Sequence, residues 1–177
     1  MKSPSKLLAA LSALVLAGSS LQADEPFFQI GVWAPDLQLE SAASNIKGIR
    51  LNFVYVENKN VTGADLFFVG VTRGDFKGFA WNLGEWVDGS AKGVLWSGFN
   101  RVGGDFLGWQ GAFVGLNEGN ATGLQTGFAN ISRGSFKGLQ LGFVNYAEKL
   151  NGVQVGLLNV ARNSDLFWIF PFVNFAF

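Results

Sequence analysis

The sequence predicts an all-β protein of about ten short strands, arranged in repeats of about 15 residues. Three observations carry this prediction: glycines recur at a fixed spacing, apolar residues alternate with small or polar ones inside each repeat, and turn-forming residues separate the repeats. The spacing is clearest in a column of glycines 15 residues apart, with one last step of 14: Gly48, Gly63, Gly78, Gly93, Gly108, Gly123, Gly138 and Gly152.

Each repeat has the period-two pattern of a strand. In the segment FKGLQLGFVNY, glycines and Gln140 fall on one face, and leucines and Phe143 fall on the other. Strict alternation is typical of β-strands, and two glycines in eight residues would cost a helix roughly 2 kcal/mol relative to alanine. The alternation breaks once per repeat, at Phe143 and Val144. A β-bulge or a corner at that point would bring Asn145 back to the face of Gln140.

Short polar segments lie between the strands: TRGD, VDGS, VGGD, NEGN and SRGS. Each places glycine beside Asp, Asn or Ser, the composition of tight turns in which glycine takes a positive φ. Their carboxylates, Asp75, Asp88, Asp105 and Glu118, would offer a cation oxygen ligands if they lined one rim. Turn capping explains the same residues without any ligand.

The N-terminal segment predicts export. Residues 1–23 combine the basic Lys2 and Lys6, an apolar stretch from Leu7 to Ala17 and a small-residue exit that ends at Ala23. This is the pattern of a cleaved signal peptide. We therefore expect residues 24–177 to form a single all-β repeat domain.

The composition excludes several classes of function. The chain has no Cys and no His, which excludes Ser-His-Asp and Cys-His catalysis and metal sites built on histidine or thiolate. We therefore expect no enzymatic activity, no cofactor and no metal. Loss of Lys2 and Lys6 from the 13 basic residues leaves 11 against 13 acidic ones. Nothing in this balance indicates a nucleic-acid partner.

Two architectures fit a sheet with one apolar and one polar face. In an outer-membrane-type β-barrel or meander the apolar face would meet lipid and the polar face would line the lumen. In a β-solenoid with 15-residue coils, the alternative, apolar residues would stack inside each coil and Gln and Asn would form exposed ladders.

The barrel is favoured by the predicted export, by the bulk of the tryptophans and by the ending FPFVNFAF, in which Phe175 and Phe177 match a barrel-assembly signal. Pro171 argues against it, because it lacks the N–H that closure of the last strand would use.

The candidate functional residues lie on the polar face. Arg50 and Asp65 are charges in strand centres at the same place in consecutive repeats, so paired strands would set them opposite each other. The remaining members of this lumen or polar face are Gln110, Gln125, Gln140, Gln154, Asn130, Asn145 and Asn159.

The tandem GLQLGFVN units, the segment KGIRLNFVYVENKNVTGADLFFVG (residues 47–70) and the ending PFVNFAF resemble the bacterial GLQLGLVN-type surface-repeat proteins. The resemblance implies an exported protein of the outer membrane or cell surface of a diderm bacterium, and it brings no catalytic residues.

Together these observations predict a structural or narrow-pore barrel whose partners are outer-membrane lipid and the barrel-assembly machinery. The alternative is a surface β-solenoid that binds or adheres through its Gln and Asn ladders.

Overall fold

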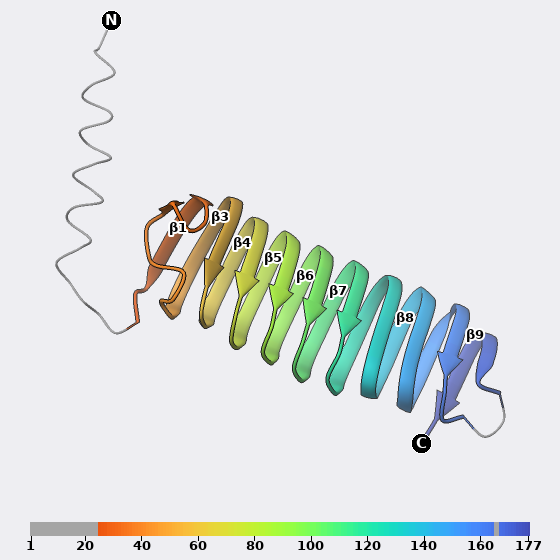
Figure 1. Ribbon diagram of the computed structural model, residues 1–177. Helices are drawn as coiled ribbons and strands as arrows, with labels where there is room; N and C mark the ends of the chain where they lie inside the picture. The colour runs from red at the N-terminus through yellow and green to blue at the C-terminus, as the bar shows by residue number, and fades with distance from the viewer. Residues whose placement is uncertain (1–24, 165–166) are drawn as a thin grey trace, which may run out of the picture.

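The structure is a computed structural model that describes residues 25–164 and 167–177. The predicted signal peptide, residues 1–23, lies outside the described residues. Within the described residues the chain forms nine strands of one sheet, wound into a stack of flattened coils (Figure 1). The strands are β1 (Phe28–Trp33), β2 (Leu37–Gln38), β3 (Ile46–Asn58), β4 (Val61–Thr72), β5 (Phe76–Val87), β6 (Ala91–Val102), β7 (Phe106–Asn117), β8 (Ala121–Ala161) and β9 (Ile169–Ala176).

The fold is a β-solenoid, so the sequence-based alternative of 15-residue coils is confirmed and the predicted barrel is wrong. From β3 to β8 successive strands are parallel, and each residue lies opposite its equivalent one repeat later, as Gly63 lies opposite Gly78. A membrane barrel instead joins antiparallel neighbours and closes on itself. This sheet is open, with β2 and β9 at its two edges.

Each coil consists of two facing segments, a corner between them and a turn that closes the loop. We number the positions of a coil from 1 to 15, so that Phe76 is at position 1, Gly78 at position 3, Leu83 at position 8 and Ser90 at position 15. The ladder of paired residues skips position 8, where each strand bends. The predicted break in alternation is therefore a corner, and it recurs in every coil from β4 to β7.

The ends of the solenoid follow the repeat to different extents. At the N-terminal end, Gln29 of β1 lies opposite Arg50 in a parallel pair, so β1 is a partial further coil. At the C-terminal end, β9 is antiparallel to β8 and sets Asn174 opposite Gln154. The parallel repeat therefore ends with β8, and Asn174 does not belong to a further parallel coil. Pro171 lies in this edge strand, where a missing N–H is tolerated.

The glycine column at position 3 is required by the backbone. At Gly108 φ is 143°, and a Cβ would lie 1.9 Å from the carbonyl oxygen of Gly93 in the preceding coil. The sequence had placed the positive φ in the turns instead. The turn glycines are needed for close approach: a Cβ on Gly89 would lie 2.5 Å from the carbonyl oxygen of Gly74.

The interior is most apolar next to the turns, and Ala80 and Leu95 at position 5 extend the core toward the corner. In the middle of the solenoid the column at position 1 alternates large and small side chains, so that the Phe106 ring lies between Ala91 and Ala121. Its members from the middle of the solenoid are Phe76, Ala91, Phe106, Ala121 and Phe136, all buried.

The side chains between this column and the corner are mostly polar. Gln, Asn and charged residues lie inside the coils, whereas Leu, Phe and Trp lie outside. This arrangement is opposite to the one expected for a solenoid from the sequence. The bulky aromatics that argued against a narrow coil are compatible with it because they are not inside it.

Candidate functional site

The four glutamines of the predicted polar face form one continuous ladder inside the solenoid. They occupy position 5 of successive coils and are at most 1% exposed. The side-chain amide of each glutamine donates to the side-chain oxygen of the one before: Gln125 to Gln110 at 2.7 Å, Gln140 to Gln125 at 2.5 Å and Gln154 to Gln140 at 2.7 Å. Parallel stacking makes this possible, because it sets identical amides one above another, each offering both a donor and an acceptor.

The three asparagines of the polar face form a second ladder at position 10. The Asn130 amide donates to the side-chain oxygen of Asn145 at 2.8 Å, and the Asn145 amide donates to that of Asn159 at 2.8 Å. All three are buried. A ligand in solution therefore cannot reach the amides of either ladder, and the predicted adhesion through exposed Gln and Asn ladders is wrong.

The two ladders also show that the segments of a coil face each other across the interior. The hydroxyl of Ser132, at position 12, donates to the side-chain oxygen of Gln125, at position 5, over 3.1 Å. The outward side chains of positions 4 and 6 therefore lie on the opposite side of the coil from those of positions 9 and 11.

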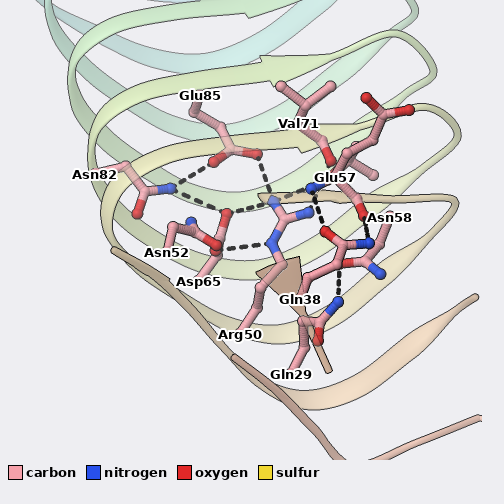
Figure 2. Close-up of polar contacts among 11 residues, drawn as sticks. Gln29, Gln38, Arg50, Asn52, Glu57, Asn58, Asp65, Val71, Asn82 and Glu85 are labelled. Atoms are coloured by element: carbon pink, nitrogen blue, oxygen red, sulfur yellow. Dashed lines mark hydrogen bonds and ion pairs between the residues drawn. The ribbon is translucent and has the colours of Figure 1, made fainter. Parts of the chain in front are cut away.

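Arg50 and Asp65 lie opposite each other in β3 and β4, as predicted, and both are fully buried (Figure 2). Arg50 Nε donates to Asp65 Oδ1 at 2.9 Å, and Nη2 donates to Oδ2 at 2.5 Å. The remaining guanidinium donors reach the carbonyl oxygen of Val71 at 2.8 Å and the hydroxyl of Thr72 at 3.2 Å. The bidentate geometry and these further bonds compensate for part of the desolvation cost of a buried ion pair.

A third charged residue, Glu85 of β5, belongs to the same cluster. Its Oε1 lies 3.5 Å from Arg50 Nη2, and Asn82 donates to its Oε2 at 2.5 Å. Analysis of the sequence missed Glu85, although the repeat could have found it: Glu85 is 15 residues before the buried Asn100 and shares position 10 with the asparagine ladder.

The pKa values of Asp65 and Glu85 shift in opposite directions because the two carboxylates share one cation, Arg50. Burial alone would lower the pKa of Arg50, but Asp65 and Glu85 offset this effect and raise it. Burial alone would raise the pKa of Asp65, but the charge and hydrogen bonds of Arg50 hold it below its ordinary value. Burial and the neighbouring Asp65 carboxylate together raise the pKa of Glu85 well above 4.5. The arrangement therefore favours one buried ion pair beside a neutral, protonated Glu85.

A strained residue accompanies this cluster. Phe67, at position 7 of β4, has φ of 98° and is exposed, whereas its equivalents Asn52 and Asn82 are buried. The two asparagine amides both donate to Asp65, at 2.6 and 3.0 Å. Because the Phe67 side chain points outward, the amides of Asn52 and Asn82 occupy the interior around Asp65.

The turn edge of the solenoid is covered by two polar ladders. At position 15, a side-chain oxygen in each coil accepts the backbone N–H of the next: Asn60 from Asp75 at 2.7 Å, Asp75 from Ser90 at 2.8 Å, and Asp105 from Asn120 at 2.8 Å. A chain of exposed ion pairs runs beside it through Glu57, Arg73, Asp88, Arg101, Glu118 and Arg133.

The four turn carboxylates singled out in the sequence are thus divided between these two ladders. Asp75 and Asp105 accept backbone N–H groups, whereas Asp88 and Glu118 pair with arginines. Within the described residues they form no cluster suited to a metal ion.

The outer face of the coils is apolar from position 4 to position 9 and, apart from the charged Glu57 and Arg101, also at position 11. At the corner, the rings of Phe113, Phe128 and Phe143 stack with centroid separations of 5.0 and 5.2 Å, and Phe113 is 58% exposed. On one side of the corner lie Trp81 and Trp96, 56% and 52% exposed. We call positions 4, 6, 8, 9 and 11 the outer apolar face.

Phe175 and Phe177 lie at the C-terminal end of the solenoid and are 54% and 88% exposed. Phe175 is in the antiparallel edge strand β9, opposite Val153. Because the sheet does not close, the two residues do not end a barrel strand, and the reading of them as a barrel-assembly signal has lost its structural basis.

In comparisons with protein-family models, curated proteins and solved structures, nothing matches this chain. Its resemblance to the GLQLGLVN-type surface-repeat proteins therefore stays a prediction from the tandem motif. In the part of the chain that the structure describes, no helix has the length and apolarity needed to cross a membrane.

Proposed function

We propose that this chain is a non-catalytic, exported β-solenoid that acts as a binding module of the bacterial cell surface through its outer apolar face. The observation that carries the proposal is the inverted distribution of side chains. Amides and charges fill the interior, and large apolar side chains cover the outside along the length of the solenoid.

The energetic argument rests on exposed area. A Phe side chain that is about half exposed leaves roughly 100 Å² of apolar surface in water, which corresponds to about 2.5 kcal/mol on burial. Contiguous apolar surface larger than a few hundred Å² on a protein marks an interaction site. The stacked Phe113, Phe128 and Phe143 alone approach this size, and they are one short part of the face.

The same structure argues against catalysis at the buried charged cluster. Arg50, Asp65 and Glu85 are the strongest candidates for acid–base chemistry, and all three side chains are fully buried. A substrate would need direct contact with at least one of them. Their hydrogen bonds are instead directed at one another and at the surrounding backbone, as in a structural core.

The proposal is tested by charges placed on the outer face. In Phe113→Lys/Phe143→Lys, two lysines replace rings of the corner stack. The matched control is Leu107→Lys/Thr122→Lys, which adds the same charge at position 2, on the polar border. We expect wild type and control to bind detergent micelles or self-associate in sedimentation velocity, and the corner variant to sediment as a monomer with an unchanged circular dichroism spectrum. A monomeric wild type that binds no micelles would refute the proposal.

A further inference from the structure

The composition of the outer apolar face is uniform along the solenoid. Positions 4, 6, 8 and 9 of the eight coils from Ile46 onward contain no charged residue. The one side-chain hydroxyl among them, that of Thr126, accepts a hydrogen bond from Trp109 Nε1 at 3.0 Å. A typical protein–protein interface combines an apolar core with a polar rim and directional hydrogen bonds about every 100–200 Å². This surface offers almost no such anchors, but acyl chains need none.

The apolar residues lie on both sides of the corner, which restricts how the face can be covered. Trp81 and Trp96 project from positions 4–6 on one side, and Trp86 and Phe99 project from positions 9–11 on the other. A partner with a flat surface would cover only one of these two sides. A fluid phase such as a lipid layer, into which the corner inserts, would cover both sides.

The dimensions fit one leaflet of a bilayer. The four residue steps from position 4 to position 8 span about 13 Å at 3.3 Å per residue, and half of a hydrocarbon core is about 15 Å thick. Seven steps of about 4.8 Å between the eight coils make the corner roughly 34 Å long. Because the backbone groups of positions 4–7 and 9–11 pair between coils, insertion leaves unpaired peptide groups in hydrocarbon chiefly at the corner, position 8.

A column of lysines borders the apolar face at position 2. Lys47, Lys77, Lys92 and Lys137 are exposed and lie two residues before the first apolar position of their coils. Of these four lysines, Lys47 forms an ion pair, with Glu25. Among the described residues, no carboxylate lies within 4.0 Å of the other three. On the opposite border, at positions 11 to 13, the charges are neutralised by their own chain of ion pairs. On the position 2 border the charges nearest the apolar face are cationic, and the turn carboxylates Asp75 and Asp105 lie two positions farther from it.

We infer that the occupant of the outer apolar face is the acyl region of an anionic membrane leaflet. The solenoid lies with its axis in the membrane plane, its corner column inserted and the lysines of position 2 at the lipid phosphates. This inference rests on the proposed binding function and names its partner. It needs no barrel, because the chain enters one leaflet as an amphipathic edge, in the way an amphipathic helix does.

The test is flotation of the mature chain with vesicles of phosphatidylcholine alone and of phosphatidylcholine with phosphatidylglycerol. We expect binding to both, stronger to the anionic vesicles, and quenching of tryptophan fluorescence by acyl-chain bromines. Phe113→Lys/Phe143→Lys should bind at least tenfold more weakly to both. Lys77→Gln/Lys92→Gln should lose about 25-fold on anionic vesicles only, at about fivefold per lysine. Leu107→Lys, which fills a gap in the lysine column, should gain about fivefold on the same vesicles.

Three outcomes would overturn the inference in different ways. If the chain binds micelles but floats with neither vesicle, lipid is not the occupant and the binding face itself stands. If vesicles compete with self-association and the corner variant loses only the latter, the occupant is a second copy of this chain. If the chain neither binds micelles nor self-associates, the proposed function fails together with the inference.

Discussion

Replacement of Asp65 by Asn tests the charge assignment inside the solenoid. The change removes the carboxylate that holds Arg50 Nε and Nη2 at 2.9 and 2.5 Å. A buried cation that loses its partner typically costs a protein 3–5 kcal/mol. Here Glu85 lies 3.5 Å from the same guanidinium, and the Asp65 charge that helped keep it protonated is gone. We therefore expect Glu85 to ionise and to reduce the loss of unfolding free energy to about 2 kcal/mol.

Two further variants isolate the role of Glu85. Because burial and Asp65 raise the pKa of Glu85, we expect Glu85 to be protonated, so that Glu85→Gln replaces one neutral group by another of similar shape and should cost about 1 kcal/mol or less at neutral pH. The double variant has no carboxylate to pair with Arg50 and should lose the full 3–5 kcal/mol. The double-mutant cycle then gives a coupling of about 1–2 kcal/mol beyond additivity.

The assay is urea denaturation at pH 7 for the four proteins, with hydrogen exchange of the β3, β4 and β5 amides to localise the loss, because repeat arrays need not unfold as one unit. Additive losses, or a Glu85→Gln variant as unstable as Asp65→Asn, would mean that Glu85 is ionised in the wild type. Either result would refute the assignment.

The raised pKa of Glu85 also sets the sign of a pH dependence. The folded state binds the Glu85 proton more tightly than the unfolded state, in which the pKa is near 4.5. The stability that this difference contributes is complete below pH 4.5 and is lost as the pH rises toward the folded-state pKa, at up to about 1.4 kcal/mol per pH unit. Glu85→Gln should therefore gain stability relative to wild type as the pH rises above 4.5. Asp65, with a lowered pKa, contributes stability above pH 3.8 that is lost as the pH falls toward its folded-state pKa. An unchanged difference between Glu85→Gln and wild type from pH 4 to pH 8 would contradict the shift.

The remaining predictions concern the ladders and the glycine column. Gly108→Ala should lose about 3 kcal/mol or more, because its Cβ would clash with the Gly93 carbonyl oxygen at a φ of 143°. Gly111→Ala, whose Cβ would have its nearest neighbour 3.4 Å away, should stay within about 1 kcal/mol of wild type when both variants are compared by urea denaturation. Gln125→Leu should cost about 2–4 kcal/mol, since Gln140 Nε2 and Ser132 Oγ lose their shared acceptor; a variant as stable as wild type by urea denaturation would show that the ladder contributes nothing. Asp105→Ala should cost about 1 kcal/mol through the lost acceptor for the Asn120 N–H, whereas Asp105→Asn keeps an oxygen there and should be near neutral; equal losses in the two variants would exclude this hydrogen bond as the cause.

Much of the candidate site followed from the 15-residue spacing. Arg50 and Asp65 were expected to meet because they occupy the same place in consecutive repeats, and they do. The spacing could place Glu85 on the polar face at position 10, but it could not place Glu85 beside Arg50, because Arg50 lies at position 5 two coils earlier and meets Glu85 only across the interior. Phe67, likewise, has an ordinary apolar identity in the sequence, and only its φ of 98° and its exposure distinguish it.

By itself, the sequence determined the period, the strand conformation and the division of each strand into an apolar and a polar face. These are local properties, and they follow from glycine spacing and alternation. Which face is turned inward was decided only by the tertiary structure, because a period-two pattern is unchanged when the two faces are exchanged. Parallel coils set each amide on its own equivalent, so that the donors and acceptors of Gln110, Gln125 and Gln140 pair inside. The bulky Trp81 and Phe113 lie outside the coils, on the face that does not contribute to these ladders.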